Sequence, residues 1–368
     1  IDLVAKHRDT DGYAAIQCKF YDEDGTVPKG DIDSFVATSG KAEFTARYIF
    51  DTAKAWSKNA EDTLTGLAVP VQRIDINYLN DAPIDWAKYS WSTPEQVTPT
   101  GPKNLRPYQR QAISKVREAF TALDRGKLIM ACGTGKTFTS LKIAEDLVGA
   151  GGSVLFLVPS IQLLSQSLRG WMANAEVDIR PFAVCSDVRV GRKSSTTDSG
   201  DISTIDLTEP ATTKADKLAM RMQTGKHAKD RMTVVFATYQ SIDVVAEAQQ
   251  LGVPGFDLII CDEAHRTTGV TLAGQDESAF VRVHDSSFLK GDRRLYMTAT
   301  PRVFGEDVRR KAKDAEAILA DMSDETTYGP ESTDSGSPRP SRTAGSPTTR
   351  SSSSPSTSST SPTTSNKP

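Results

Sequence analysis

The sequence predicts an α/β protein, in which a parallel sheet with helices on both faces is preceded by a smaller α+β segment and followed by a disordered tail. Between Leu105 and Arg302, short apolar runs alternate with helical patterns, and this order of elements is typical of parallel sheets. One run leads into a glycine-rich turn and then a helix, as a phosphate-binding loop requires. After Glu331 the composition changes to Ser, Thr and Pro, which bury too little apolar surface to become ordered.

The first segment, residues 1–91, is expected to fold as a small α+β domain. Its pattern predicts a strand at the start, a return strand at Ala14–Phe20, helical stretches between Ile32 and Ala60, and a strand near Val71–Ile76. Residues 92–104 contain several prolines and a glycine, which indicates a linker.

The main domain is expected over residues 105–305. A polar stretch between Ser186 and Asp230 is interpreted as a surface insertion, mobile and with one helix near Lys217. Residues 306–331 are expected to form a connecting helix, and residues 332–368 the disordered tail. The expected strands are Leu128–Cys132, Val154–Pro159, Phe182–Cys185, Thr233–Thr238, Leu258–Cys261 and Leu295–Thr298.

Composition limits the partners and the surroundings of the protein. The formal net charge of the 368 residues is −3, so no global positive field indicates nucleic acid, and any DNA contact must be local. The four cysteines are widely separated, which gives neither metal-ligand spacing nor a disulfide framework and favours the reducing cytoplasm. No run approaches the roughly 20 apolar residues of a membrane helix, so no membrane partner is expected.

A nucleotide site is predicted where the first apolar run of the main domain ends. The run leads into Gly133-Thr134-Gly135-Lys136-Thr137 and then into a helix. Glycines let backbone N–H groups approach phosphates, the lysine reaches the β and γ oxygens, and the threonine hydroxyl can hold Mg²⁺. The sequence therefore predicts ATP and Mg²⁺ as cofactors, bound by Gly133, Thr134, Gly135, Lys136 and Thr137.

Two acids follow the apolar run Leu258–Cys261. Asp262 and Glu263 would lie at the carboxyl edge of a parallel sheet, where ligands of such sheets bind. We expect Asp262 to hold Mg²⁺ and Glu263 to position or deprotonate the attacking water. The alternative is a charge cluster at the start of a helix.

These motifs, in this order, resemble those of superfamily 2 helicases, in the branch that contains the res subunits of type I, type III and type ISP restriction enzymes. The resemblance covers roughly residues 105–302 and implies a RecA-like, P-loop NTPase fold. It also implies that Gln109, within Leu105-Arg106-Pro107-Tyr108-Gln109, contacts adenine, and that His265 links the ATP site to a coupling motif. The coupling residues implied are Thr298, Ala299 and Thr300, and the residues implied to contact DNA are Pro159, Ser160, Thr238 and Gln240.

The first segment carries a second constellation, in which an acid on one strand meets Gln-x-Lys on the next. In a hairpin, Gln17 and Lys19 share a face that can meet Asp2. Asp2 and a nearby carbonyl would hold Mg²⁺ or Mn²⁺ for phosphodiester cleavage, with Lys19 stabilising charge. The pattern resembles the Mrr-like branch of the PD-(D/E)xK nucleases, whose additional helical acid would lie upstream of Ile1. The alternative is a solvated pair of side chains on neighbouring strands.

The leading hypothesis is an ATP-driven translocase on double-stranded DNA, fused to an endonuclease domain of a restriction system. The resemblance implies a methyltransferase and specificity module as a further partner, and a second RecA-like domain that is not visible after Arg302. One hypothesis for the tail is a frameshift near Ser332, because GC-rich codons read one base back give an amphipathic stretch and an apolar strand. Two alternatives remain: an inactive product that binds ATP and DNA, and a motor whose first domain binds DNA without cutting.

Overall fold

A computed structural model of the chain describes residues 1–6, 12–22, 24–64, 67–80, 82, 84–93, 96–101, 103–185, 211–224, 228–271, 279–306, 310 and 318–331. All of these residues belong to one unit, Ile1–Asp334. The tail expected over residues 332–368 lies outside the described residues, as does the part of the polar insertion at residues 186–210. Among the described helices, none is both long enough and apolar enough to cross a membrane.

The first segment forms a four-stranded mixed sheet in the order β1-β2-β4-β6. β1 and β2 are antiparallel, as predicted, whereas β2, β4 and β6 run parallel. The strands are β1 (Leu3–Lys6), β2 (Tyr13–Lys19), β4 (Phe44–Asp51) and β6 (Val71–Ile74). The sheet is therefore a hairpin extended by two parallel strands.

β4 interrupts the range between Ile32 and Ala60, where the sequence predicts helical stretches and no strand. Helices occupy only the flanks of that range, at α1 (Lys29–Thr38) and α2 (Lys58–Thr63). The intervening residues Phe44–Asp51 are rich in aromatic and β-branched side chains, which favour a half-buried pleated strand over a helix. Ile32 and Phe35 of α1 pack with Ile49 of β4 in the core of this sheet.

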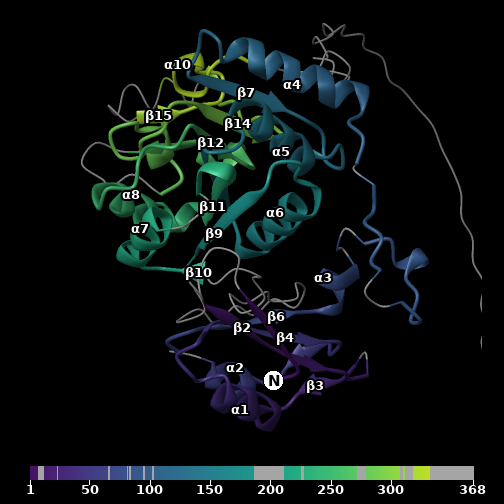
Figure 1. Ribbon diagram of the computed structural model, residues 1–368. Coiled ribbons are helices and arrows are strands. Elements are labelled where there is room, and N and C mark those ends of the chain that lie inside the picture. The colour runs from purple at the N-terminus through teal and green to yellow at the C-terminus, as the bar shows by residue number, and fades with distance from the viewer. Residues whose placement is uncertain are drawn as a thin grey trace, which may run out of the picture. The chain divides into compact units, whose positions relative to one another are not determined.

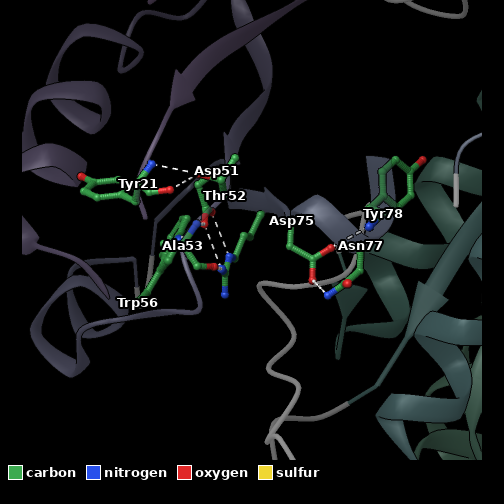
Figure 2. A network of polar contacts seen from close by, with 9 residues as sticks. Tyr21, Asp51, Thr52, Ala53, Trp56, Asp75, Asn77 and Tyr78 are labelled. Atoms are coloured by element: carbon green, nitrogen blue, oxygen red, sulfur yellow. Dashed lines mark hydrogen bonds and ion pairs between the residues drawn. The ribbon is translucent and has the colours of Figure 1, made fainter. Parts of the chain in front are cut away.

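A buried polar network fixes the end of β4. The carboxylate of Asp51 accepts two hydrogen bonds from the Arg73 guanidinium, both 2.9 Å, and one of 2.8 Å from Trp56 Nε1. Figure 2 shows Trp56, Ala53 and Thr52 gathered around Asp51. Because the Asp51 side chain is fully buried, these donors replace the water that its charge would otherwise require. The network thereby ties β4 to β6.

Short elements complete the first part of the chain. They are the parallel pair β3 (Thr26–Val27) and β5 (Ala55–Trp56), helix α3 (Ile76–Asn80), which begins after Asp75, and the 3₁₀ turn η1 (Trp86–Lys88). The Asp75 carboxylate accepts a hydrogen bond of 2.8 Å from the backbone N–H of Tyr78, which satisfies one amide of the first turn of α3.

The main domain contains a seven-stranded sheet in the order β10-β9-β11-β8-β12-β14-β7, and every neighbouring pair is parallel (Figure 1). The predicted parallel α/β sheet is confirmed. The strands are β7 (Arg125–Ile129), β8 (Ser153–Val158), β9 (Ile179–Val184), β10 (Ala211–Thr212), β11 (Met232–Thr238), β12 (Leu258–Cys261) and β14 (Arg294–Thr298). β7 begins three residues before its predicted start at Leu128 and ends at Ile129, so Cys132 lies in the loop and is exposed.

Helices cover both faces of this sheet. One face carries α4 (Pro107–Ala119), α5 (Lys136–Leu147) and α6 (Ile161–Asn174), and the other carries α7 (Ala215–Gln223) and α8 (Ile242–Gln250). The strands are buried on both faces, which explains their continuous apolar runs. Helix α7 confirms the helix expected near Lys217.

The segment after Arg302 differs from the predicted connecting helix. Glu306 and Arg310 are helical, but Ile318–Ala320 forms strand β15, which pairs antiparallel with β13 (Gly269–Thr271). A single helical turn, α10 (Glu325–Tyr328), follows. The helix prediction is wrong at Ile318–Ala320, because backbone pairing with β13 replaces the hydrogen bonds within a helix. The remaining 3₁₀ turns are η3 (Ala228–Asp230), η4 (Tyr239–Ser241), η5 (Ala264–Thr267) and η6 (Arg282–His284).

Candidate functional site

The glycine-rich loop between β7 and α5 has the geometry of a phosphate cradle. Gly133 and Gly135 have φ angles of 77° and 84°, a conformation that side chains disfavour. A Cβ on Gly135 would also lie 2.8 Å from Gln109 Nε2, which is too close for a heavy-atom contact. Helix α5 begins directly after this loop, at Lys136, so its unpaired N–H groups and the positive end of its dipole face the loop.

Two side chains of α4 hold this loop. Gln109 Nε2 donates to the Thr134 carbonyl over 3.0 Å, and the Tyr108 hydroxyl donates to the same oxygen over 2.9 Å. Gln109 Oε1 accepts from the backbone N–H of Arg106 over 2.9 Å, and the side chain is only 4% exposed. Gln109 therefore stabilises the loop directly through Thr134. The sequence predicted only a contact between Gln109 and adenine, not this one.

The two acids lie where β12 ends, beside this loop. Asp262 is 6% exposed, and burial, followed by the negative charge of Glu263, raises its pKa to about 6. Glu263 has a φ of 49°, and its carboxylate Oε1 lies 3.7 Å from the Lys136 ammonium. Lys136, Asp262 and Glu263, predicted from separate motifs, thus lie together.

His265 joins Glu263 to Thr298, at the end of β14, where the sequence predicts a coupling motif. Its Nδ1 lies 3.3 Å from Glu263 Oε2 and 3.0 Å from Thr298 Oγ1. The same Thr298 hydroxyl accepts from the backbone N–H of Thr300 over 3.2 Å, which closes a turn around Ala299. The structure therefore brings His265 into direct contact with Thr298, one of the predicted coupling residues.

The residues predicted to contact DNA differ in their exposure. β8 and β11 are neighbours with Val158 opposite Thr238, so Pro159, Ser160 and Gln240 follow strands that end at one sheet edge. Gln240 is exposed and Ser160 is half-buried, with its hydroxyl capping α6. The Thr238 side chain is buried and donates to Ser241 Oγ over 3.1 Å. The Thr238 hydroxyl thus stabilises the turn after β11. Pro159 is also buried.

In the first segment, the exposed carboxylate of Asp2 meets the second strand. Asp2 Oδ2 accepts from Gln17 Nε2 and from the backbone N–H of Cys18, both over 2.7 Å. Lys19 forms an ion pair of 3.5 Å with Asp31 in α1. The predicted meeting of Asp2 with Gln17 is confirmed, whereas the partner of Lys19 is an acid whose role the sequence did not reveal.

Tyr21 also contacts Asp31, and the sequence did not predict this contact. Its hydroxyl donates to Asp31; burial and this bond raise the pKa of Tyr21 to about 12, and the bond holds the pKa of Asp31 below its ordinary value. The backbone of Tyr21 is fixed in turn by Thr52, whose hydroxyl accepts from Tyr21 N over 2.8 Å and donates to Tyr21 O over 2.6 Å (Figure 2).

Within the part of the chain that the structure describes, no group of three or more His, Cys, Asp or Glu side chains gathers as a metal site. Asp262 and Asp2 are the carboxylates predicted to hold a divalent ion at the two candidate sites. This pattern fits Mg²⁺, which keeps several waters and is usually bound by one or two carboxylates plus substrate phosphates.

Comparison with known families identifies the main domain. A family model described as type III restriction enzyme, res subunit, matches residues 102–303, more than half of the chain. The chain belongs to this res-subunit family. A second family model, described as restriction endonuclease, matches residues 1–96. The res-subunit domain is thus a helicase domain fused to a restriction-enzyme-type nuclease domain, as predicted.

Individual relatives agree with the family. The res-subunit chain is 42% identical to a solved structure of the ATP-dependent type ISP restriction-modification enzyme LlaBIII bound to DNA, with a TM-score of 0.73 over 88% of this chain and 21% of that one. It is 32% identical to the probable helicase A859L of African swine fever virus, and 27% identical to the type I restriction enzyme EcoAI endonuclease subunit of Escherichia coli. Those two matches cover 54% of this chain and 19% and 20% of the relatives. The chain therefore spans about a fifth of the length of these proteins.

Proposed function

We propose that the chain carries the first RecA-like domain of an ATP-driven translocase on double-stranded DNA, together with a metal-dependent endonuclease domain of a restriction system. The observation that carries the proposal is the continuous set of contacts from Lys136 through Glu263 and His265 to Thr298. These contacts join a phosphate-binding loop to the end of β14, as a site that converts hydrolysis into movement requires.

Each residue of the ATP site has a separate task. Lys136 and the loop N–H groups bind the β- and γ-phosphates, while Thr137 and Asp262 would hold Mg²⁺. Bound Mg²⁺ would neutralise charge on the phosphate oxygens. Glu263 orients the attacking water and takes its proton, because its carboxylate is held at the loop by Lys136 and His265.

ATP hydrolysis with and without duplex DNA tests the motor. We expect Mg·ATP to bind, Lys136→Ala to abolish binding, and duplex DNA to increase any turnover. Binding of ATP that is identical in wild type and Lys136→Ala would refute the proposed site. Hydrolysis that does not respond to duplex DNA would refute the translocase and leave a DNA-independent ATPase.

The nuclease proposal rests on Asp2 and Lys19. Asp2 keeps one carboxylate oxygen, Oδ1, outside its two short hydrogen bonds, and this oxygen would hold Mg²⁺ or Mn²⁺ together with a carbonyl near Gln17. Lys19 would orient the water or stabilise the negative charge that develops on the phosphate. Since Lys19 forms an ion pair with Asp31, the second candidate is a domain that binds DNA without cutting it.

Ser160 and Gln240, at the carboxyl ends of β8 and β11, are the proposed contacts to DNA phosphates. We infer that a methyltransferase and specificity module supplies sequence recognition, since LlaBIII is a restriction-modification enzyme. The four cysteines are free thiols, which supports an enzyme of the reducing cytoplasm.

A further inference from the structure

The strap, defined as residues Ile318–Glu331, folds back onto the main domain. Its strand β15 pairs with β13, which begins two residues after the η5 turn. Lys127 of β7 binds the strap twice: its N–H donates to the Pro330 carbonyl over 2.9 Å, and its ammonium donates to the Met322 carbonyl over 2.8 Å. Lys127 is 5% exposed, so the Met322 carbonyl replaces part of the solvent around a buried charge. The strap is therefore docked by specific contacts.

One side chain of the strap reaches the turn that carries the catalytic acid. Tyr328 is fully buried, and its hydroxyl lies 3.1 Å from Thr267 Oγ1. The Thr267 hydroxyl donates to the Ala264 carbonyl over 2.8 Å. Because a hydroxyl has a single hydrogen, Thr267 must accept at its other contact, and Tyr328 is the donor. Hydrogen bonds thus run from Tyr328 through Thr267 to Ala264, which lies between Glu263 and His265.

A second chain of hydrogen bonds reaches Thr267 from the side. His284 Nε2 lies 3.1 Å from the Thr267 carbonyl, which can only accept, so the proton of the neutral ring is on Nε2. Nδ1 then accepts from the Tyr296 hydroxyl over 2.9 Å. Arg125 donates to the His284 carbonyl over 2.8 Å and to the strap at Thr327 O over 3.0 Å. The strap and the η5 turn therefore share one polar network.

The η5 turn needs such support. Glu263, its N-cap, is the one non-glycine residue with a positive φ in the described chain, and its side chain makes no cap hydrogen bond. Backbone in this region persists only where neighbouring contacts hold it. Tyr328 and His284 supply those contacts from outside the turn.

We propose that Tyr328 is a positioning residue for ATP hydrolysis: by holding Thr267 it fixes the turn that presents Glu263 and His265, and it makes the strap respond to the nucleotide. The inference rests on the proposed ATP site. It adds a path by which a change at Glu263 reaches the strap, separate from the contact between His265 and Thr298.

The test uses the full chain and four variants. Tyr328→Phe and Thr267→Val each remove one hydroxyl of the path, whereas Thr267→Ser keeps it. Thr326→Ala is the matched control, since its hydroxyl bonds Asp324 within the same strap, over 2.7 Å, without touching Thr267. The readouts are kcat and KM for ATP, the melting temperature, and amide hydrogen exchange over residues 318–331 with and without Mg²⁺ and a slowly hydrolysed ATP analogue.

We expect Tyr328→Phe and Thr267→Val to lower kcat by about tenfold with KM changed less than about twofold, the pattern of a lost transition-state interaction. Thr267→Ser and Thr326→Ala should keep the wild-type kcat. The analogue should slow exchange over the strap in wild type and Thr326→Ala, and this response should disappear in Tyr328→Phe.

Several outcomes would overturn the proposal. A loss of kcat in Tyr328→Phe no larger than in Thr326→Ala at an equal loss of melting temperature would make Tyr328 merely structural. If wild type binds the analogue but exchange over the strap does not change, the path fails while the ATP site stands. If wild type binds no nucleotide, the proposed ATP site fails as well. If the chain binds ATP but does not hydrolyse it, the amide hydrogen exchange over residues 318–331 alone decides between the proposal and a merely structural role of Tyr328.

Discussion

The ammonium of Lys136 lies 3.7 Å from the carboxylate of Glu263, so the lysine that would bind the γ-phosphate faces the acid that would activate the water. A bound γ-phosphate and the Glu263 carboxylate would both be negatively charged and would both lie near the Lys136 ammonium. Nucleotide binding must therefore accommodate two negative groups around one cation, and the charge of Glu263 opposes binding while its basicity serves hydrolysis.

Glu263→Gln should separate these two effects. We expect the dissociation constant for Mg·ATP to fall about twofold to fivefold, because a repulsive charge near the phosphates is removed. Hydrolysis should fall by about a hundredfold or more, as expected on loss of a general base. Titration with a fluorescent ATP analogue gives the first quantity and phosphate release the second. Weaker binding in this variant, with the melting temperature unchanged, would contradict the assignment of Glu263.

The sequence predicted that Lys136, Asp262 and Glu263 lie close together, because each motif is local. A strand, a glycine turn and a helix are adjacent in the chain, and so are Cys261, Asp262 and Glu263. Parallel pairing then brings strand ends to one edge, which explains why residues as distant as Lys136 and His265 were placed correctly relative to the sheet.

Contacts without a local pattern were missed. Tyr328 and Thr267 are 61 residues apart, and no periodicity links them. Asp31 lies in the first turn of α1, where an acid is favourable for any helix, so its pairing with Lys19 had no distinct signal. Strand β4 was assigned to helix because its short run lies between two true helices, α1 and α2.

Lys19→Ala should abolish metal-dependent nicking of duplex DNA. Lys19 is part-buried and pairs with Asp31, which also accepts from the Tyr21 hydroxyl. The charge of Lys19 would stabilise the phosphate in the transition state, a contribution of about a hundredfold or more. Lys29→Ala is the matched control, since Lys29 is exposed and forms an ion pair with Asp33 of its own helix. Supercoiled plasmid with Mg²⁺ or Mn²⁺ measures nicking. Equal nicking by wild type and Lys19→Ala would exclude this site, and absent nicking with retained DNA binding would favour the domain that binds without cutting.

Arg73→Ala should destabilise the first domain strongly. Arg73 is the ionic partner of the fully buried Asp51, and removal of one partner of a buried pair costs about 3–5 kcal/mol because the other charge remains unpaired. Lys54→Ala removes the exposed pair with Asp24 and should cost less than about 1 kcal/mol. Urea unfolding followed by tryptophan fluorescence measures the stability of the first domain, since Trp56 donates a hydrogen bond directly to Asp51. Similar midpoints for both variants would show that the Asp51 network does not hold the domain together.

His284→Gln should make the stability of the main domain less sensitive to acid. Burial, aided by the positive charges of Arg125 and Arg294, lowers the pKa of His284 to about 4, whereas the unfolded imidazole titrates near its ordinary 6.5. Between these values the unfolded chain binds a proton that the native state does not. The free energy of unfolding therefore falls as pH falls through this window, by at most about 1.4 kcal/mol per pH unit, and the contribution of His284 is complete above the window.

A comparison of wild type with His284→Gln at two pH values isolates the contribution of His284 to the free energy of unfolding, because the two proteins share all other titrating groups. Between pH 7 and pH 5, wild type should lose about 2 kcal/mol more than the variant. Urea unfolding of both proteins at each pH gives the difference directly. An equal loss in the two proteins would mean that His284 titrates alike in the folded and unfolded chains, and its neutral ring could then no longer be taken to orient Thr267 beneath the catalytic turn.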